Sequence, residues 1–182
     1  MRKLRYNVAT SLDGFIAAED GGYDWIVEDP TIDFGALFEQ FDAFVMGRKT
    51  YETLQAQGEQ NPLQGRRLVV ATRTLAATSE PDTLFVGEGI ETAVADLKRE
   101  PGKDIWLFGG GELARCLFDA GLVDTVELAV MPVLLGAGRP ALPAGGRVPL
   151  ALESTLPRDS GIVQLSYAVR RESAGGSLSG EA

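Results

Sequence analysis

The sequence predicts a single α/β domain built on a mixed sheet. Short apolar segments of strand length alternate with segments of helical periodicity along most of the chain. Two strand-like segments run through glycine directly into a helix, and the last two apolar segments are typical of an antiparallel hairpin. The 182 residues, 45% of them hydrophobic, are enough for one substantial core.

The first half of the chain is expected to alternate strand and helix. Alternating polarity over residues 3–10 predicts the first strand, and the Ser-Leu-Asp-Gly that follows predicts a turn. Apolar residues at helical spacing over residues 34–41 predict a helix, and residues 43–46 form a short apolar strand that ends at glycine. The next expected elements are a helix over 50–57, strands over 66–71 and 83–86, and a helix over 91–99.

The second half repeats this pattern and then closes the sheet. An apolar strand over 104–108 leads through three glycines into a helix over 112–120. A long strand over 125–135, interrupted at Pro132, precedes a hairpin of residues 147–155 and 162–171. Residues 172–182 are rich in Gly and Ser, so we expect a flexible tail after one domain that spans residues 1–171.

The rare residue types exclude several classes of enzyme. One cysteine, Cys116, and no histidine leave neither an intramolecular disulfide nor a set of metal ligands, so we expect no metal site. The absence of histidine also excludes the serine and cysteine triads and the zinc deaminase signature. The remaining possibilities are carboxylate chemistry or chemistry supplied by a cofactor.

Charge and hydropathy predict a cytoplasmic protein that acts on small molecules. The apolar runs are far shorter than the roughly 20 residues that a membrane-spanning helix needs, and the N-terminal segment does not resemble a signal peptide. A net charge of -9 without a basic run argues against binding to nucleic acid. Any anionic ligand must therefore be held by a local group of residues.

Two strand-to-helix junctions are candidate phosphate sites. Free N–H groups and the helix dipole converge where a strand ends in glycine and a helix begins. The first junction is Met46-Gly47-Arg48-Lys49-Thr50, and the second is Phe108-Gly109-Gly110-Gly111-Glu112-Leu113. Either alone is as readily a tight turn, and the second does not match GxGxxG. Glu112 would have to point away from a bound phosphate.

A third candidate lies at the end of the strand over residues 66–71. Thr72 and Arg73 place a hydroxyl and a guanidinium there, and arginine binds phosphate through two parallel hydrogen bonds. Taken alone, Arg73 is as readily a solvated residue at a strand end.

Five motifs follow one another along the chain. They are Ser11-Leu12-Asp13-Gly14-Phe15-Ile16-Ala17, Met46 to Glu52, Thr72-Arg73, Phe108 to Gly111, and Pro132-Val133-Leu134-Leu135-Gly136-Ala137-Gly138. In this order they resemble the dihydrofolate-reductase-like superfamily. The resemblance covers residues 3–170 and is strongest to the branch related to the C-terminal reductase domain of the riboflavin-biosynthesis deaminase/reductase. It implies a mainly parallel sheet flanked by helices, NADPH as hydride donor, and a pterin or pyrimidine-like acceptor.

The resemblance also assigns residues to two parts of a site. Contact with the cofactor's diphosphate region is implied for Gly47, Arg48, Lys49, Thr50, Gly109, Gly110 and Gly111, and contact with the 2′-phosphate for Thr72 and Arg73. Glu112 and Leu113, which follow the three glycines, are also implied to contact the cofactor. The nicotinamide and substrate pocket is implied for Ala9, Ser11, Asp13, Gly14, Ile16 and Trp25, although Trp25 is as readily a packed side chain. A homodimer, supported by the strand from residue 126 to residue 135, is implied by the same branch.

The acceptor and the acid that protonates it stay open at this point. The candidates for a catalytic acid are Asp33 and, less directly, Asp29, and either is as readily a helix cap. Residues 54–63 lack the Asp-Asp-Pro segment and the arginine with which the riboflavin branch holds its ribose phosphate.

The leading hypothesis is an NADPH-dependent reductase of a small heterocyclic acceptor. A non-catalytic NADPH-binding or nucleotide-binding module of the same fold is the alternative, because no residue stands out as a proton donor. A flavin-binding protein is a third possibility, which a colourless protein without affinity for FMN would exclude.

Overall fold

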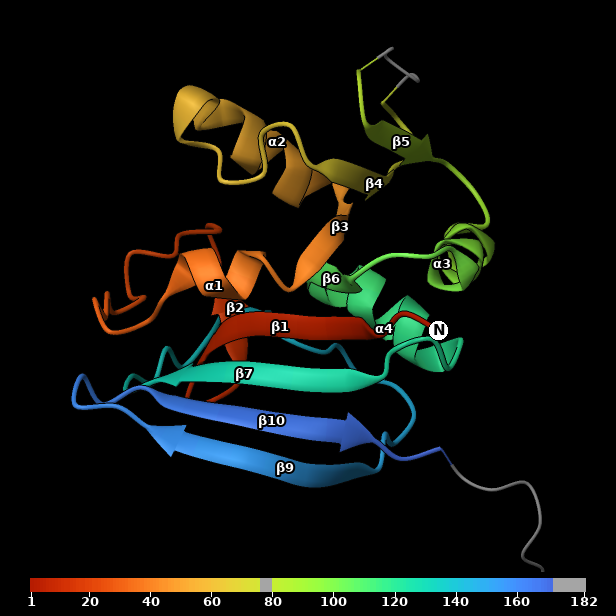
Figure 1. Ribbon diagram of the computed structural model, residues 1–182. Helices are drawn as coiled ribbons and strands as arrows, with labels where there is room; N and C mark the ends of the chain where they lie inside the picture. Colours follow the sequence, from red (N-terminus) through yellow and green to blue (C-terminus); the bar gives the residue numbers. More distant parts are fainter. Residues whose placement is uncertain (76–79, 172–182) are drawn as a thin grey trace, which may run out of the picture.

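An eight-stranded mixed sheet forms the centre of the molecule, and the computed structural model describes residues 1–75 and 80–171 (Figure 1). Its strands are β1 (Leu4–Ser11), β3 (Phe41–Gly47), β4 (Arg67–Ala71), β5 (Thr83–Val86), β6 (Asp104–Gly109), β7 (Thr125–Met131), β9 (Leu150–Pro157) and β10 (Val163–Val169). Their order is β5-β4-β3-β6-β1-β7-β10-β9. The first six strands in this order, β5, β4, β3, β6, β1 and β7, are parallel to one another, and β10 is antiparallel to both of its neighbours.

This topology confirms the predicted mixed, mainly parallel sheet with a C-terminal hairpin. The helices are α1 (Phe34–Phe38), α2 (Arg48–Ala56), α3 (Ile90–Arg99) and α4 (Gly111–Asp119), with a 3-10 turn at Gly58–Gln60. None of the helices in the described residues has the length and apolar character needed to cross a bilayer. The tail expected at residues 172–182 lies outside the described residues.

Alternate residues of the central strands pack into two hydrophobic cores, one on each face of the sheet. On β6, Ile105 and Leu107 join α3 and α4 in one core, whereas Trp106 joins α2 in the other. The period of two along a strand produces this division. Figure 1 accordingly shows α1 and α2 to one side of the sheet and α3 and α4 to the other.

The connections diverge between the neighbouring strands β3 and β6. The chain leaves β3 through α2 and returns at β4, whereas it leaves β6 through α4 and returns at β7 beyond β1. Crossovers that run in opposite directions place their helices on opposite faces. In α/β sheets such a switch point opens a crevice at the carboxyl ends of the strands, where ligands bind.

The structure differs from the sequence prediction at several boundaries. The predicted strand over residues 125–135 ends at Met131, because Pro132 has no N–H and Val133 N–H bonds back to Met131 O. The predicted helix over residues 50–57 begins earlier, at Arg48, directly after the extended Gly47. A second sheet of β2 (Phe15–Ala17) and β8 (Arg139–Pro140) was not predicted, because a strand of two residues has no periodicity to detect.

Candidate functional site

A cleft of about 2010 Å³ begins at the switch point and continues over one face of the sheet. We call its first part the glycine end, formed by residues 47–50 and 109–113. We call the other part the sheet end, formed by Asn7 and Ala9 on β1, Glu127 and Ala129 on β7, and Gln164 and Ser166 on β10. A typical ligand pocket measures roughly 300–1,000 Å³, so this cleft has room for more than one small molecule.

Two helix N-termini meet at the glycine end. α2 follows Gly47 and α4 follows Gly110, and neither glycine position supplies a side-chain cap. The first N–H groups of each helix therefore have no side-chain acceptor at the cap, and the positive ends of two helix dipoles lie beside one cleft. This arrangement favours an anionic ligand.

Three of the four glycines of this end divide into two kinds, and the fourth, Gly109, has φ 147°. A Cβ added at Gly47 or Gly110 would meet no atom of the described residues within 4 Å, although both residues line the cleft. A Cβ at Gly111 would lie 2.5 Å from Pro140 O, so that glycine is required by protein packing alone. Gly47 and Gly110 instead leave open space that a ligand can use.

Charged side chains surround this space. Arg48 pairs with Glu52 at 2.8 Å, and Lys49 is exposed. Glu112 also lines the cleft, as does Arg139, a residue that no motif in the sequence indicated. The Arg139 guanidinium lies 3.1 Å from where a Cβ of Gly21 would be. The only sequence signal near it is the glycine-rich turn that ends at Gly138.

Thr72 and Arg73 lie beside the glycine end without lining it. Gly47 pairs with Ala71 across β3 and β4, and Ala71 lines the cleft. The buried Thr72 Oγ accepts hydrogen bonds from Thr74 N at 3.3 Å and Leu75 N at 3.0 Å, which shapes the turn after β4. Arg73 is exposed on this turn. Its contact with a 2′-phosphate stays a prediction.

The loop after β1 is held in shape by Asp13. Ser11 Oγ donates to the Asp13 carboxylate at 2.6 Å, and the N–H groups of Leu135 and Gly136 donate at 3.1 and 2.7 Å. These bonds, with that from Ser11 the strongest, lower the pKa of Asp13. Ala9 and Ile16 line the cleft, whereas Ser11, Asp13 and Gly14 are not among the described residues that line it. They support the loop from outside.

Side chains at the sheet end form two rows across the strands. Asn7, Glu127, Ser166 and Ser154 are consecutive partners on β1, β7, β10 and β9, and Ala9, Ala129, Gln164 and Leu156 form the next row. Residues paired in this way present their side chains on one face. Figure 1 shows no helix, within the described chain, in front of these four strands. The floor is therefore polar in one row and largely small or apolar in the other.

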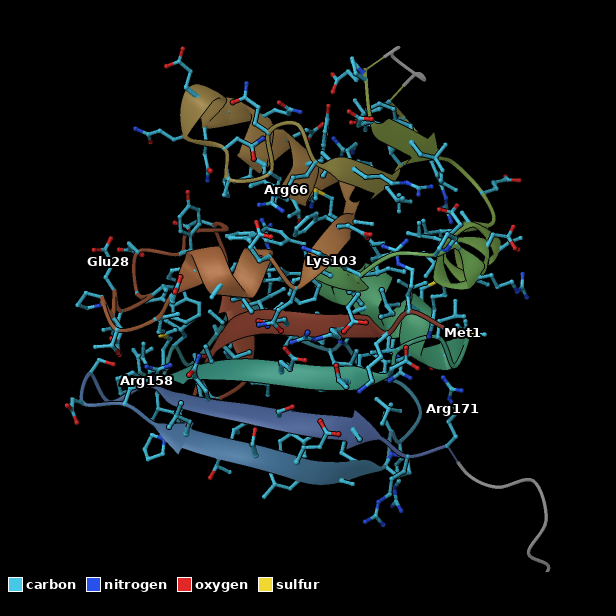
Figure 2. The ribbon with its side chains drawn as sticks, in the orientation of Figure 1. Met1, Glu28, Arg66, Lys103, Arg158 and Arg171 are labelled. Carbon is cyan, nitrogen blue, oxygen red and sulfur yellow. The ribbon has the colours of Figure 1, made fainter. Side chains whose placement is uncertain are left out.

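The loop between β2 and α1 forms the roof of the sheet end. Tyr23, Ile26 and Ile32 from this loop line the cleft. Trp25 does not line it within the described residues; its Nε1 donates to Gly22 O at 3.3 Å, which supports the packed alternative. Figure 2 shows Glu28, on the roof, at the same end of the molecule as Arg158, which follows β9.

Asp29 fastens this roof to the turn between β9 and β10. Its buried carboxylate accepts hydrogen bonds from Ser160 Oγ at 2.6 Å, from Thr31 Oγ1 at 2.5 Å and from Thr31 N at 2.8 Å. Arg158 Nη1 adds a bond to Thr31 O at 3.2 Å. The hydrogen bond from the Ser160 hydroxyl, followed by those from the Thr31 hydroxyl and the Thr31 N–H, lowers the pKa of Asp29, so this carboxylate is an ionised anchor.

Asp29 should make the stability of the roof depend on pH. Because folding lowers the Asp29 pKa, its contribution is present above the unfolded value of about 3.9 and is lost as the pH falls through the folded value. The difference in unfolding free energy between the wild type and Asp29→Asn should therefore shrink below about pH 4. Urea denaturation from neutral to acid pH measures it, and a difference independent of pH would contradict this role.

Asp33, the predicted catalytic acid, caps a helix. Its Oδ1 accepts a hydrogen bond from Ala36 N at 2.9 Å at the start of α1. Asp33 is also not among the described residues that line the cleft. The structure thus places this carboxylate at a helix cap, the alternative that its sequence pattern also allowed. Its catalytic role stays a prediction.

Comparison with known proteins identifies relatives with this architecture. The family model of the RibD C-terminal domain matches residues 2–164. The uncharacterized protein YyaP of Bacillus subtilis (strain 168) is 32% identical over 178 residues, which cover 91% of this chain and 94% of YyaP.

Two solved structures share the fold at low sequence identity. One is the diaminohydroxyphosphoribosylaminopyrimidine deaminase/5-amino-6-(5-phosphoribosylamino)uracil reductase of Thermotoga maritima, with a TM-score of 0.71, 16% identity, and 93% of this chain and 57% of that chain covered. The other is dihydrofolate reductase from Enterococcus faecalis complexed with NADP(H), with a TM-score of 0.68, 18% identity, and 93% and 97% covered. At these identities the likeness concerns the fold alone.

Proposed function

The chain belongs to the RibD C-terminal domain family, and from that premise we propose that it is an NADPH-dependent reductase that transfers a hydride to a small heterocyclic acceptor. Family membership and the dihydrofolate-reductase-like fold support an oxidoreductase of reductase type. The cofactor and the kind of acceptor are the finer parts of the proposal.

The observation that carries the proposal is the convergence of two helix N-termini on one cleft. α2 and α4 start from the neighbouring strands β3 and β6, and no side chain at either cap occupies their free N–H groups. A diphosphate carries its charge on two adjacent phosphates, so it suits two such N-termini better than one. The rest of the cleft is large enough for a second, smaller molecule.

The residues of the glycine end fit NADPH. Gly47 and Gly110 provide the open space that close approach of a diphosphate requires, and Lys49 and Arg48, which also pairs with Glu52, carry positive charge. Glu112 lines the cleft too, and its carboxylate would have to turn away from the phosphates. Arg73, on the turn beside Gly47, would hold the 2′-phosphate. When bound, NADPH supplies the hydride. The chain's own residues would bind and orient the two reactants and exclude water beneath the roof loop.

Arg73 provides a test of cofactor choice. Arg73→Ala is expected to weaken NADPH binding by about 1.5 to 3 kcal/mol, because a hydrogen-bonded ion pair with the 2′-phosphate is lost. NADH has no 2′-phosphate, so its affinity should barely change. Isothermal titration of both dinucleotides against the wild type and the variant measures the effect.

Arg99→Ala is the matched control. Arg99 is an exposed arginine at the end of α3, and its side chain is 67% accessible. Its removal should leave both affinities unchanged. Equal losses of NADPH and NADH affinity in Arg73→Ala would overturn the assigned role of Arg73.

A specific observation favours a second candidate, a non-catalytic NADPH-binding module. Asp29 binds Ser160 and Thr31, Asp33 caps α1, and Glu127 accepts four hydrogen bonds, so these three carboxylates are already engaged. A reductase of this kind would obtain its proton from water, from the acceptor itself, or from Glu28 or Glu112, the two other carboxylates among the described residues that line the cleft. NADPH binding without oxidation across a panel of pterins, pyrimidines and simple carbonyl compounds would favour the module; acceptor-dependent turnover would exclude it.

A further inference from the structure

The polar row at the sheet end contains a carboxylate, Glu127, whose hydrogen-bond acceptor positions are all taken by protein groups. Glu127 Oε1 accepts hydrogen bonds from Arg5 Nε at 2.6 Å and Thr125 Oγ1 at 3.1 Å. Glu127 Oε2 accepts from Arg5 Nη2 at 2.8 Å and Asn7 Nδ2 at 2.9 Å. A carboxylate offers about four acceptor positions, and here all four are used. Glu127 is therefore an anchor for its neighbours.

Arg5 is itself held from several sides. Its Nη1 donates to Gln40 Oε1 at 2.8 Å and lies 3.5 Å from Asp104 Oδ2, and its guanidinium stacks 4.5 Å from the centre of the Phe41 ring. Burial alone would lower the Arg5 pKa, but the hydrogen bonds and charge of Glu127 raise it overall. The Arg5 and Glu127 side chains are each only 15% exposed. The pair is thus a fixed, charge-compensated unit.

This unit fixes the orientation of Asn7. The Asn7 amide must turn its Nδ2 toward Glu127, because Oδ1 in that position would meet a carboxylate oxygen with no proton between them. Asn7 O also accepts the Trp106 indole N–H at 2.8 Å, which anchors the main chain. Asn7 lines the cleft, so its Oδ1 is an oriented acceptor that Glu127 does not use.

We propose that Asn7 determines acceptor specificity by accepting an N–H hydrogen bond from an uncharged nitrogen heterocycle, with Glu127 and Arg5 as its positioning residues. This inference rests on the proposed function of the cleft. The adjacent Ala9 and Ala129 leave space for a flat ring, and Trp106 and Phe108 supply aromatic wall. Because Glu127 neutralises Arg5, this floor offers no uncompensated charge for a phosphorylated substituent.

A pair of probes in which two N–H groups are replaced by N–CH3 groups tests the proposal, and the Asn7→Leu variant below separates the lost hydrogen bond from the added bulk. Lumazine has two ring N–H groups, and 1,3-dimethyllumazine has none. The wild type is expected to bind lumazine about ten-fold more tightly, the scale of one buried hydrogen bond. Titration followed by tryptophan fluorescence measures both. In Asn7→Leu, which has similar volume but no acceptor, the preference should disappear while NADPH affinity stays unchanged.

Exchanging the amide and the carboxylate between positions 7 and 127 tests the positioning role of Glu127. Asn7→Asp places two carboxylates side by side, so their mutual repulsion should raise the pKa at which the pair loses its last proton. The charged groups around it are Arg5 on β1, Asp104 on β6, Glu127 on β7 and Glu153 on β9, which bonds Ser166. Lumazine binding by Asn7→Asp should therefore fall as the pH rises. The double variant Asn7→Asp/Glu127→Gln restores a donor opposite an acceptor and should remove this pH dependence.

The outcomes separate this inference from the proposed function. Loss of the lumazine preference in Asn7→Leu, together with rescue by the exchange, supports the assignment. Equal affinity of the wild type for both probes, or binding of neither, overturns it even when NADPH binds. Failure of the wild type to bind NADPH would count instead against the proposed function.

Discussion

Gly47→Asp is expected to abolish tight NADPH binding while the protein stays at least as stable as the wild type. Gly47 has φ -82° and ψ 162°, which any residue can adopt, and within the part of the chain that the structure describes an added Cβ meets no atom within 4 Å. Aspartate is a favoured N-cap and its charge suits the helix dipole, so stability should change by no more than about 1 kcal/mol. A carboxylate about 4 Å from a phosphate costs roughly 4 kcal/mol at an effective dielectric of 20, so a loss of at least about 100-fold in affinity is expected.

The Gly47→Asn variant separates the effect of charge on NADPH affinity from the effect of side-chain bulk. Asparagine caps a helix about as well as aspartate but carries no charge, so its loss of affinity should be much smaller. Gly146→Asp is a second control, because Gly146 is exposed, is equally open to a Cβ, and is not among the described residues that line the cleft. Wild-type NADPH affinity in Gly47→Asp would mean that the diphosphate does not lie at α2.

Asp124→Ala is expected to lower the free energy of unfolding by about 3 to 5 kcal/mol, because it leaves a buried ammonium without its counter-charge. The side chain of Lys98 is only 3% exposed, and its Nζ contacts Asp124 Oδ2 and Leu122 O, each at 2.5 Å. The same Oδ2 accepts Leu4 N at 2.8 Å, which joins α3 to the start of β1 and β7. Urea denaturation of the variant measures the loss.

Two further variants identify the cause. Asp96→Ala removes an exposed pair with Arg99 and should change stability by less than about 1 kcal/mol. Lys98→Met/Asp124→Ala removes the buried charge as well and should recover part of the loss, so the test holds even if the single variant does not fold. A loss below about 1 kcal/mol in Asp124→Ala would show that Lys98 finds water in the native state.

Local signals predicted the parts of the molecule that lie close together in sequence. The strand, glycine and helix at Gly47 and at Gly110 are each contained in a few residues, and both junctions line one cleft. The order of the motifs was enough to predict the family and the fold, which the family model and the solved structures confirm. The roles of these residues in cofactor binding stay predictions.

The arrangement of side chains at the sheet end could not be predicted from local sequence patterns. Asn7 and Glu127 are 120 positions apart in sequence and meet only through the register of β1 and β7. Neither residue carries a local pattern, since a polar residue on a strand face is ordinarily solvated. Asp33 shows the converse problem. Its type and position suited both an acid and a helix cap, and only the bond to Ala36 N distinguishes where the carboxylate lies.

The most direct test of the proposed reductase is to titrate the purified protein with NADPH and with NADH. Isothermal calorimetry and tryptophan fluorescence each measure the binding. Trp106 lines the cleft and donates to Asn7 O at 2.8 Å, so it should report occupancy. We expect NADPH to bind at least about ten-fold more tightly than NADH, because only NADPH offers Arg73 a 2′-phosphate. Binding of neither dinucleotide would contradict the proposed function and leave the family and the fold as the established properties of this chain.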